Sequence, residues 1–241
     1  MNALKKSSRH LNPEFQVRFA GENLRQWMAH FTANIREAEP LLTKLDTAIG
    51  DGDHGINMRC GMDAVAEKLD SLALADLAGQ LRVISTTLML SVDGASGPLY
   101  GTFFLQCSHA TLHKENLGLA DLTSAIEAGY RGVVQLGKAA VGDKTMVDTL
   151  AAAANSLRAS CTHSEALPEA VRACRKAARL AAEGTSPMIA RKGLAGDLGE
   201  RSVGIQDPGA TSAFLLFDSL AETVSTLTPT VHPKAQGLLL F

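Results

Sequence analysis

The sequence predicts an all-α fold, an antiparallel up-and-down bundle or barrel of eight helices with its functional loops at one end. Apolar residues recur at helical spacing in one segment after another of the 241-residue chain. Aromatic residues make up only 5% of the chain, and alanine and leucine abound, which favours helices over sheets. No convincing pair of alternating strands occurs, and short connections favour antiparallel neighbours.

The domain organisation is predicted to be simple. Residues 1–16 are polar and are expected to form a loosely ordered arm. Residues 17–225 carry all the helical stripes and form one helical domain, and residues 226–241 are a tail.

The first predicted helix is marked by Leu24, Trp27, Met28, Phe31 and Ile35. We expect Pro40 to interrupt it, and residues 41–45 to lead into an acidic loop. The later helices follow from further segments and stripes, in chain order: Asn57–Leu69; Leu77, Leu81, Ile84 and Leu88; Leu99–Leu112; Leu122, Ile126 and Val133; Met146, Leu150, Ala154 and Leu157; Val171, Cys174, Ala178 and Ala181; Ala213, Leu216, Leu220 and Val224.

Composition excludes several classes of partner. The net charge is −2 with both signs interspersed, so there is no basic stripe for nucleic acid and no polybasic patch for a membrane surface. No apolar run approaches the length of a membrane span. The four cysteines form neither CxxC nor zinc spacing and no secretory signal is evident, which predicts reduced thiols in the cytoplasm.

The loop around Asp51-Gly52-Asp53 is the strongest candidate for chemistry. Asp51 and Asp53 can turn their oxygens toward one point, and Asp46 can join them if the chain folds back. Hard oxygen ligands suit Mg²⁺ or Ca²⁺, and Mg²⁺ is commonly shared with nucleotide phosphates. An EF-hand is excluded, because Ile56 and Met62 stand where it needs glycine and glutamate. The alternative is a polar turn that caps the next helix.

Three further glycine-containing loops, residues 93–98, 137–148 and 204–212, separate predicted helices. Each taken alone is an ordinary helix–helix turn. Alternate loops of an up-and-down bundle meet at one end, so these loops and the acidic loop are expected to line one rim. Their helix N-termini would offer backbone amides to phosphates, and Lys144 could offset phosphate charge. Three carboxylates and a nucleotide diphosphate carry about −6, which two Mg²⁺ reduce to about −2.

These motifs together resemble a known family. They are Asp46 with Ile49-Gly50-Asp51-Gly52-Asp53-His54-Gly55, Gly94-Ala95-Ser96-Gly97-Pro98-Leu99-Tyr100-Gly101-Thr102, Gly142-Asp143-Lys144-Thr145-Met146, Leu198-Gly199-Glu200-Arg201-Ser202 and Gln206-Asp207-Pro208-Gly209-Ala210-Thr211-Ser212. In order and spacing they resemble the nucleotide-binding L subunit (DhaL type) of dihydroxyacetone (glycerone) kinase, over residues 20–225. The resemblance implies a barrel of eight antiparallel helices with the nucleotide at one end.

The resemblance also implies the site residues. Asp46, Asp51 and Asp53 would hold a pair of Mg²⁺ ions that bridge the phosphates of ADP or ATP. The residues implied to form the nucleotide pocket are His54, Gly55, Ile56, Asn57, Ala95, Ser96, Gly137, Met146, Asp207, Pro208 and Gly209. His54 is a candidate general base by its chemistry, although a pocket-lining hydrogen bonder is the simpler interpretation.

Two positions depart from the family pattern. Leu194 begins a segment that replaces the usual basic-aromatic run and its nucleotide-reaching arginine, for which Arg191, Lys192 or Arg201 could substitute. Ile205 replaces a common histidine. Nucleotide affinity or substrate preference is therefore expected to differ.

The leading hypothesis is a kinase subunit that transfers a phosphoryl group to dihydroxyacetone, or a related short ketose, held on a separate K subunit. The nucleotide is either a resident ADP recharged by a phosphohistidine protein of the phosphotransferase system, or exchangeable ATP. The alternative is a nucleotide-sensing regulatory protein with little catalysis of its own. A fatty-acid-kinase-like domain ranks lower, because that family usually carries further fused domains. The sequence is also compatible with a homodimer.

Overall fold

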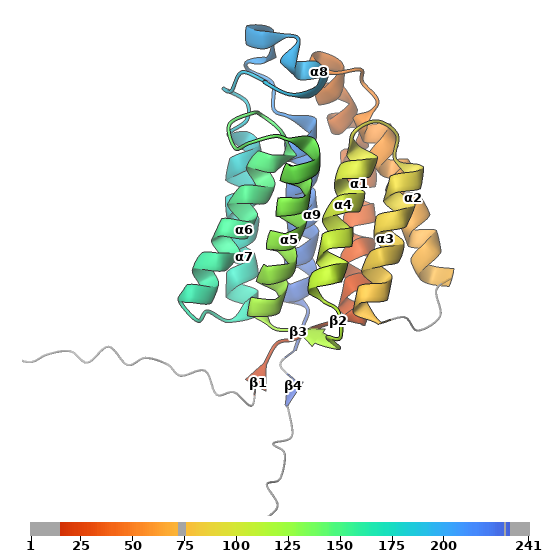
Figure 1. Cartoon of the computed structure of the whole chain (residues 1–241), viewed down its shortest axis with the longest axis vertical. Coiled ribbons are helices and arrows are strands. Elements are labelled where there is room, and N and C mark those ends of the chain that lie inside the picture. Colours follow the sequence, from red (N-terminus) through yellow and green to blue (C-terminus); the bar gives the residue numbers. More distant parts are fainter. Residues whose placement is uncertain (1–14, 72–75, 229, 232–241) are drawn as a thin grey trace, which may run out of the picture.

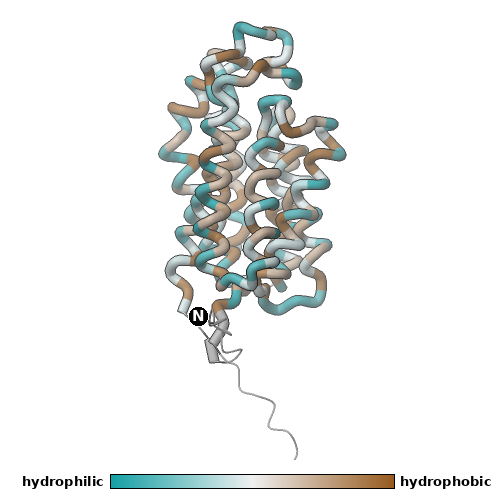
Figure 2. Tube along the Cα trace, turned by 90° about the vertical axis from the view of Figure 1, so that its left-hand side faces the viewer, coloured by the Kyte–Doolittle hydropathy of each residue, from teal (hydrophilic) through white to brown (hydrophobic). Residues whose placement is uncertain are grey.

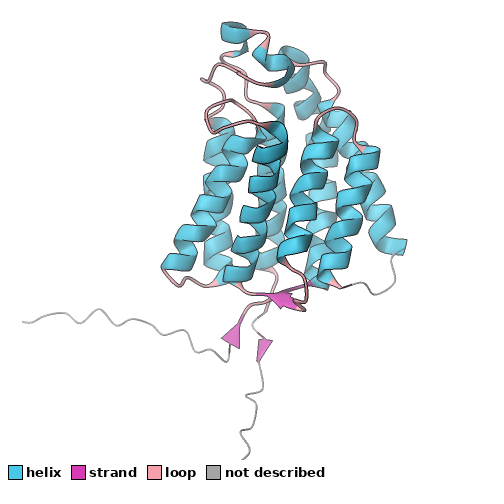
Figure 3. Cartoon of the chain, viewed as in Figure 1, coloured by secondary structure: helices cyan, strands magenta, loops and turns pink. Residues whose placement is uncertain are grey.

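The computed structural model describes residues 15–71, 76–228 and 230–231, and these are mostly helical (Figures 1 and 3). Eight long helices run up and down beside one another, as the sequence predicts. They are α1 (Gly21–Ile49), α2 (His54–Ser71), α3 (Leu77–Ser91), α4 (Ser96–Ala110), α5 (Leu119–Gly137), α6 (Met146–Thr162), α7 (Leu167–Glu183) and α9 (Pro208–Ser225). Between α7 and α9 lie two single turns, α8 (Gly193–Gly196) and the 3₁₀ turn η1 (Gly199–Ser202).

The long helices are neighbours in a ring. Each helix from α1 to α6 packs against the next along the chain, and α9 packs against both α7 and α1. The last helix therefore closes the arrangement that the first one opens. The all-helical fold predicted from sequence is confirmed, whereas a barrel in the strict geometric sense stays a prediction.

The apolar stripes form one shared core. Phe31, Ile35, Leu88, Leu150 and Leu216 are all fully buried, and they come from four different helices. Figure 2 shows brown segments along the helices and teal at many of the turns between them. Burial of such stripes, more than helix propensity, stabilises helices of this length.

The expected break at Pro40 does not occur. Helix α1 continues through Pro40 to Ile49 and so carries Asp46 on its last turn. Pro40 and Arg36 are both exposed. Water can therefore hydrate the Arg36 carbonyl, which loses its usual helical donor because proline has no N–H. The proline is tolerated here because it sits on the solvent side of the helix.

Four two-residue strands lie at the end of the bundle away from α8 (Figures 1 and 3). Strand β1 (Phe15–Gln16) pairs antiparallel with β4 (Thr230–Val231), and β2 (Phe19–Ala20) pairs antiparallel with β3 (Asn116–Leu117). Most of the predicted arm and tail, residues 1–14, 229 and 232–241, falls outside the described residues. Where the chain is described, its first and last residues meet at this end.

Within the described part of the chain, no helix is both long enough and apolar enough to cross a membrane. The four cysteines are free thiols, and Cys107 and Cys174 are buried in the core.

Candidate functional site

A cavity of about 680 Å³ opens at the end of the bundle opposite the small strands. It is lined by residues of every loop that the sequence places on one rim. These are, in chain order, Asp46, Ile49, Gly50, Asp51, Asp53, His54, Asn57, Asp93, Gly94, Ala95, Ser96, Pro98, Leu99, Val133, Leu136, Gly137, Ala139, Lys144, Thr145, Met146, Val147, Lys192, Gly193, Leu194, Ala195, Asp207, Pro208 and Gly209.

Asp46 organises the acidic loop from the last turn of α1. Its Oδ2 accepts hydrogen bonds from the backbone N–H groups of Gly52 at 2.9 Å, Asp53 at 2.9 Å and His54 at 3.1 Å. Three amides on one oxygen hold the loop folded back over α1 and start α2 at His54. The alternative interpretation, a polar turn with a capping carboxylate, is therefore correct for one oxygen of Asp46.

The same fold-back gathers three carboxylates. One oxygen each from Asp46, Asp51 and Asp53 can be chosen so that all three lie within 4.8 Å of one another. Desolvation, together with repulsion from Asp51 and Asp46, raises the pKa of Asp53. Carboxylates this close repel one another unless a cation lies between them, and an all-oxygen donor set fits Mg²⁺. These residues therefore fit a divalent hard cation.

Gly50 is required by this geometry. A Cβ atom at Gly50 would lie 2.2 Å from Asp46 Oδ1, and the backbone φ of −142° is one that any residue can adopt. The constraint is therefore purely steric. Glycine keeps Oδ1, the Asp46 oxygen that does not bind the loop amides, accessible.

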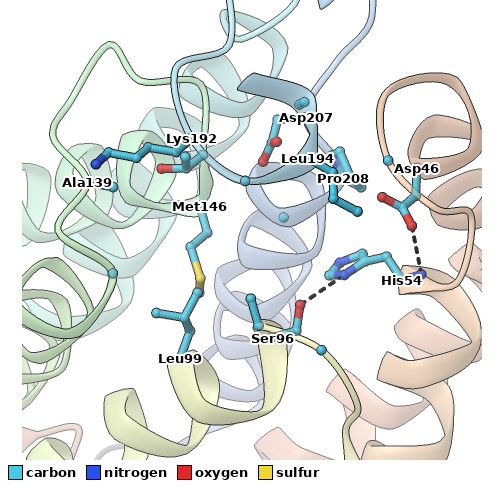
Figure 4. Close-up of a pocket in the computed structure, with 18 of the residues that line it drawn as sticks. Asp46, His54, Ser96, Leu99, Ala139, Met146, Lys192, Leu194, Asp207 and Pro208 are labelled. Atoms are coloured by element: carbon cyan, nitrogen blue, oxygen red, sulfur yellow. Dashed lines mark hydrogen bonds between the residues drawn. The ribbon is translucent and has the colours of Figure 1, made fainter. Parts of the chain in front are cut away.

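A chain of hydrogen bonds runs from the core to the rim of the cavity. The Tyr100 hydroxyl lies 2.8 Å from Ser212 Oγ, which lies 2.9 Å from His54 Nε2. His54 Nδ1 lies 3.1 Å from Ser96 Oγ, a bond that Figure 4 shows. Burial lowers the pKa of His54 to about 4, so the imidazole is neutral near pH 7. Ser212 Oγ can donate to the Gly209 carbonyl at 3.1 Å.

If the Ser212 hydroxyl donates to the Gly209 carbonyl, its oxygen accepts hydrogen bonds from the Tyr100 hydroxyl and from the Nε2–H of His54. His54 Nδ1 is then the acceptor for the Ser96 hydroxyl. The imidazole therefore fixes Ser96 at the first turn of α4, where backbone N–H groups have no helical partner. Both ring nitrogens of His54 are engaged in this chain, which favours the hydrogen-bonding role over that of a general base.

The opposite side of the cavity is apolar. Leu99 and Val133 form part of this wall with Met146, whose side chain points toward Leu99 in Figure 4. Met146 is set by the capping box of α6, in which the Thr145 side chain accepts from the Val147 N–H and Asp148 accepts from the Thr145 N–H at 2.8 Å. A flat apolar group could pack against this wall. An anionic group could lie on the other side of the cavity, together with a cation held by the three carboxylates.

Asp207 closes the cavity from the start of α9. Its side chain accepts from the Ala210 N–H at 2.6 Å, which caps the helix. Burial raises the pKa of Asp207 to about 7, with the nearby charge of Lys144 acting in the opposite sense. Pro208 and Gly209 follow in the first turn and also line the cavity.

The structure contradicts the sequence-based interpretation of Lys144 as a counter-charge for phosphate. Lys144 lines the cavity but is only 1% exposed, and its ammonium donates to backbone carbonyls. The sequence could not indicate this, because every acceptor is a main-chain oxygen more than 40 positions away along the chain.

Two residues of the predicted pocket do not line the cavity. Gly55 is buried where α2 meets α1, and a Cβ there would lie 2.4 Å from the Glu39 carbonyl oxygen. Ile56 is 44% exposed and lies outside the lining set. The other predicted site residues do line the cavity: Asp46, Asp51, Asp53, His54, Asn57, Ala95, Ser96, Gly137, Met146, Asp207, Pro208 and Gly209.

Some cavity residues were not singled out from the sequence. Leu99 and Thr145 belong to the quoted motifs, but spacing alone did not separate them from core or cap residues. At the departure from the family pattern, Leu194 lines the cavity and is 56% exposed. Of the three basic residues considered as substitutes there, only Lys192 lines the cavity.

Comparison with known proteins agrees with this geometry. The family model of the DAK2 domain matches residues 48–222. The chain is 46% identical over 180 residues to the ADP-binding subunit DhaL of a PEP-dependent dihydroxyacetone kinase from Escherichia coli K12, covering 75% of this chain and 86% of the relative. It is 37% identical over 200 residues to the ADP-binding subunit DhaL of a PTS-dependent dihydroxyacetone kinase from Lactococcus lactis, covering 83% of this chain and 96% of that one.

A solved structure is also similar. The dihydroxyacetone kinase of C. freundii in complex with AMP-PNP and Mg²⁺ superposes with a TM-score of 0.67 at 28% identity. The match covers 92% of this chain but only 37% of the crystallised kinase, so the chain corresponds to one part of that enzyme.

Proposed function

The chain belongs to the DAK2-domain family, and from this premise we propose that it is the nucleotide-binding, phosphoryl-transferring subunit of a dihydroxyacetone kinase. The observation that carries the proposal is the cavity, which places a carboxylate triad and an apolar wall at one end of the bundle. The acceptor, dihydroxyacetone or a related short ketose, would sit on a separate K subunit.

Asp46, Asp51 and Asp53 would hold Mg²⁺, which neutralises phosphate charge during transfer when it is bound. We propose two Mg²⁺ ions, because the triad and a nucleotide diphosphate together carry a charge of about −6. The chain's own contribution is positional. Asp46 fixes the loop through Oδ2 and keeps Oδ1 accessible, so that the carboxylates are arranged before ligand arrives.

The remaining predicted residues would bind the nucleotide. Ala95 and Ser96 start α4 and would offer backbone N–H groups to the phosphates. Gly209 would do the same at the start of α9, and Asp207 and Pro208, which has no N–H, would close the pocket. Gly137 and Met146 lie on the apolar side and would flank the base. The hydrogen bond from Ser96 to neutral His54 keeps the first turn of α4 in place.

We further propose that the nucleotide is a resident ADP, recharged by a phosphohistidine protein of the phosphotransferase system. The relatives that match nearly full length are named ADP-binding subunits of PEP- or PTS-dependent kinases. The free thiols of all four cysteines are consistent with a cytoplasmic location.

A thermal-shift titration with ADP and ATP, with and without Mg²⁺, tests the nucleotide site. A ligand that binds only the folded state at about 100 times its Kd should raise the Tm by about 5 to 10 °C. Asp51→Asn should abolish the Mg²⁺-dependent part of this shift, and Asp70→Asn, an exposed carboxylate on α2, should leave it unchanged. A folded wild type that neither nucleotide stabilises would overturn the proposal.

Product formation then separates the two phosphoryl sources. The chain is mixed with a purified dihydroxyacetone-binding K subunit and ADP, and dihydroxyacetone phosphate is measured with either ATP or a phosphohistidine protein as donor. Turnover with the phosphohistidine protein and a catalytic amount of ADP supports the resident-ADP mode. Turnover only with stoichiometric ATP contradicts it, and tight nucleotide binding without turnover favours the sensing alternative.

A further inference from the structure

The ammonium group of Lys144 is surrounded by backbone carbonyl oxygens, which its sequence context does not suggest. Its Nζ lies 2.9 Å from the Thr185 carbonyl oxygen, 3.4 Å from that of Ser186 and 3.2 Å from that of Met188. It also lies 2.8 Å from the carbonyl oxygen of Ser202 and 2.6 Å from that of Ile205. Five backbone dipoles therefore converge on one buried ammonium, in the way that carbonyl oxygens surround a monovalent cation.

These carbonyls belong to the two ends of the segment that connects α7 to α9, here called its outgoing and returning arms. Residues 185–188 leave the end of α7, and residues 202–205 return toward α9. Between them residues 189–201 pass over the end of the bundle and include α8, seen above the long helices in Figure 1. The ammonium therefore joins the outgoing arm to the returning arm.

The middle of this segment is a wall of the cavity. Lys192, Gly193, Leu194 and Ala195 all line it. Other hydrogen bonds also hold the segment, and one of them joins the arms where the Asp207 N–H donates to Thr185 Oγ1 at 2.9 Å. The Arg191 N–H donates to the Asp143 carbonyl at 3.1 Å, the Gly204 N–H donates to the Ser186 carbonyl at 2.8 Å, and the Ala190 N–H donates to Ser202 Oγ at 2.9 Å. Ile189, Leu194 and Val203 are exposed, whereas Thr185, Ala190 and Ser202 are buried at the base of the arms.

The position of Lys144 couples the segment to the nucleotide side of the bundle. Lys144 directly precedes Thr145, the N-cap of α6, and Met146 on the apolar wall. It adopts a left-handed backbone conformation with φ of +60°, which a non-glycine residue adopts only when its surroundings hold it there. The five carbonyls supply that restraint.

We propose that Lys144 is a positioning residue that staples the two arms of the 185–205 segment and thereby holds Lys192–Ala195 as a wall of the nucleotide cavity. The part that concerns nucleotide rests on the proposed function, whereas the part that concerns the segment does not. Without the ammonium, the five carbonyls lose the three N–H donors that they share. The Thr185 and Ser186 carbonyls keep a backbone donor each, whereas the other three lose the donor that joins them to the opposite arm. The arms are therefore expected to separate while the helices remain packed.

The test uses the full chain and two variants. Lys144→Met keeps the aliphatic volume and removes the charge and donors, and Lys144→Ala opens space for a small amine. Trypsin reports on the segment directly, because Arg191, Lys192 and Arg201 lie within it. We expect cleavage there to be at least tenfold faster in Lys144→Met without nucleotide. The Kd for Mg-ADP should rise about tenfold or more, since apparent affinity falls with the fraction of competent conformer.

Rescue separates this role from a general loss of stability. Propylammonium replaces the three methylenes and the ammonium that Lys144→Ala removes, and should restore resistance of the segment to trypsin. Tetramethylammonium at equal concentration carries the charge without N–H donors and should not. Lys176→Met, which removes an exposed lysine of α7, serves as the matched control and should behave as the wild type.

Each other outcome overturns the proposal. A direct phosphate contact predicts weaker Mg-ADP binding with unchanged cleavage in the absence of nucleotide. Loss of far-UV helix signal in both variants would mean that Lys144 supports the whole fold rather than the segment. If the wild type bound no nucleotide, the proposed function would fail while the cleavage comparison still decided the role of Lys144.

Discussion

The two carboxylate oxygens of Asp46 have different surroundings, because Oδ2 accepts from the loop amides and Oδ1 does not. Oδ2 is fully used by three loop amides, so only Oδ1 is free to join Asp51 and Asp53. Single-residue changes near Asp46 should therefore separate loop stability from metal affinity. Gly50 is the sharpest case, because it faces Oδ1 and not Oδ2.

Gly50→Ala should weaken metal binding without unfolding the protein. The new Cβ would lie 2.2 Å from Asp46 Oδ1 and must displace that oxygen, whereas the φ of −142° at this position is negative and does not itself require glycine. Displacement of a ligand from its position typically costs about 10- to 100-fold in metal affinity. Calorimetric titration of Mg²⁺ in the presence of ADP measures the loss, and the Tm without metal is the control. Unchanged Mg²⁺ affinity would show that Oδ1 is not a ligand.

Asp207 should make stability depend on pH. Its folded-state pKa is raised to about 7 from an ordinary 3.8, so the folded protein binds this proton more tightly than the unfolded chain does. The stability it contributes is therefore greatest below pH 4, falls as the pH rises to about 7 and is constant above that. Asp207→Asn keeps a capping oxygen but has no proton to lose.

The variant should accordingly gain stability relative to the wild type between pH 4.5 and 7.5, by up to about 3 kcal/mol. Urea unfolding of both proteins at the two pH values measures this difference. Parallel stability curves would contradict a buried carboxyl with a raised pKa.

At the scale of elements, the helices were predictable and their long-range contacts were not. Apolar stripes such as Leu77, Leu81, Ile84 and Leu88 indicate a helix from local spacing alone, and α3 contains all four. The meeting of the four rim loops was also predictable, because alternate turns of an up-and-down bundle lie at the same end. Lys144 was misjudged because its partners are carbonyls of a distant segment, and main-chain acceptors leave no trace in the sequence.

Pro40 was misjudged for a different reason. Proline disfavours helix interiors by an amount that packing elsewhere can exceed, and whether it does so depends on which side of the helix it occupies. Here it occupies the exposed side of a 29-residue helix whose other face is buried. The helix therefore continues at a cost that a substitution can reveal.

Pro40→Ala should stabilise the protein by about 1 to 2 kcal/mol. The restored N–H can bond the Arg36 carbonyl, which offsets the greater entropy that alanine gives the unfolded chain. Pro168 lies in the first turn of α7, where no helical N–H bond is lost, so Pro168→Ala should give no such gain. Urea unfolding compares the two variants with the wild type. Equal effects at both prolines would mean that α1 has already adapted to Pro40.

At the scale of the whole molecule, the closed order of helices puts the cavity and the paired first and last described strands at opposite ends of the bundle. Helix α9 returns beside α1, and the Trp27 indole N–H donates to the Leu216 carbonyl at 2.8 Å across that junction. Strand β1 then pairs with β4, with Phe15 opposite Val231, at the end away from the cavity. Connectivity at this end should therefore be changeable without affecting the site.

A circular permutant tests this separation. Joining Val231 to Phe15 through a short Gly-Ser linker spans a gap of only about 5 Å between paired residues. Opened between α2 and α3, which meet at the same distant end, the permutant should fold and keep the Mg-ADP thermal shift. Opened instead between Asp51 and Gly52, with the same linker, it should fold but lose the shift, because the amides that Asp46 holds would no longer be continuous with α1. Loss of the shift in both permutants, with helix content intact, would mean that the terminal pairing contributes to the site after all.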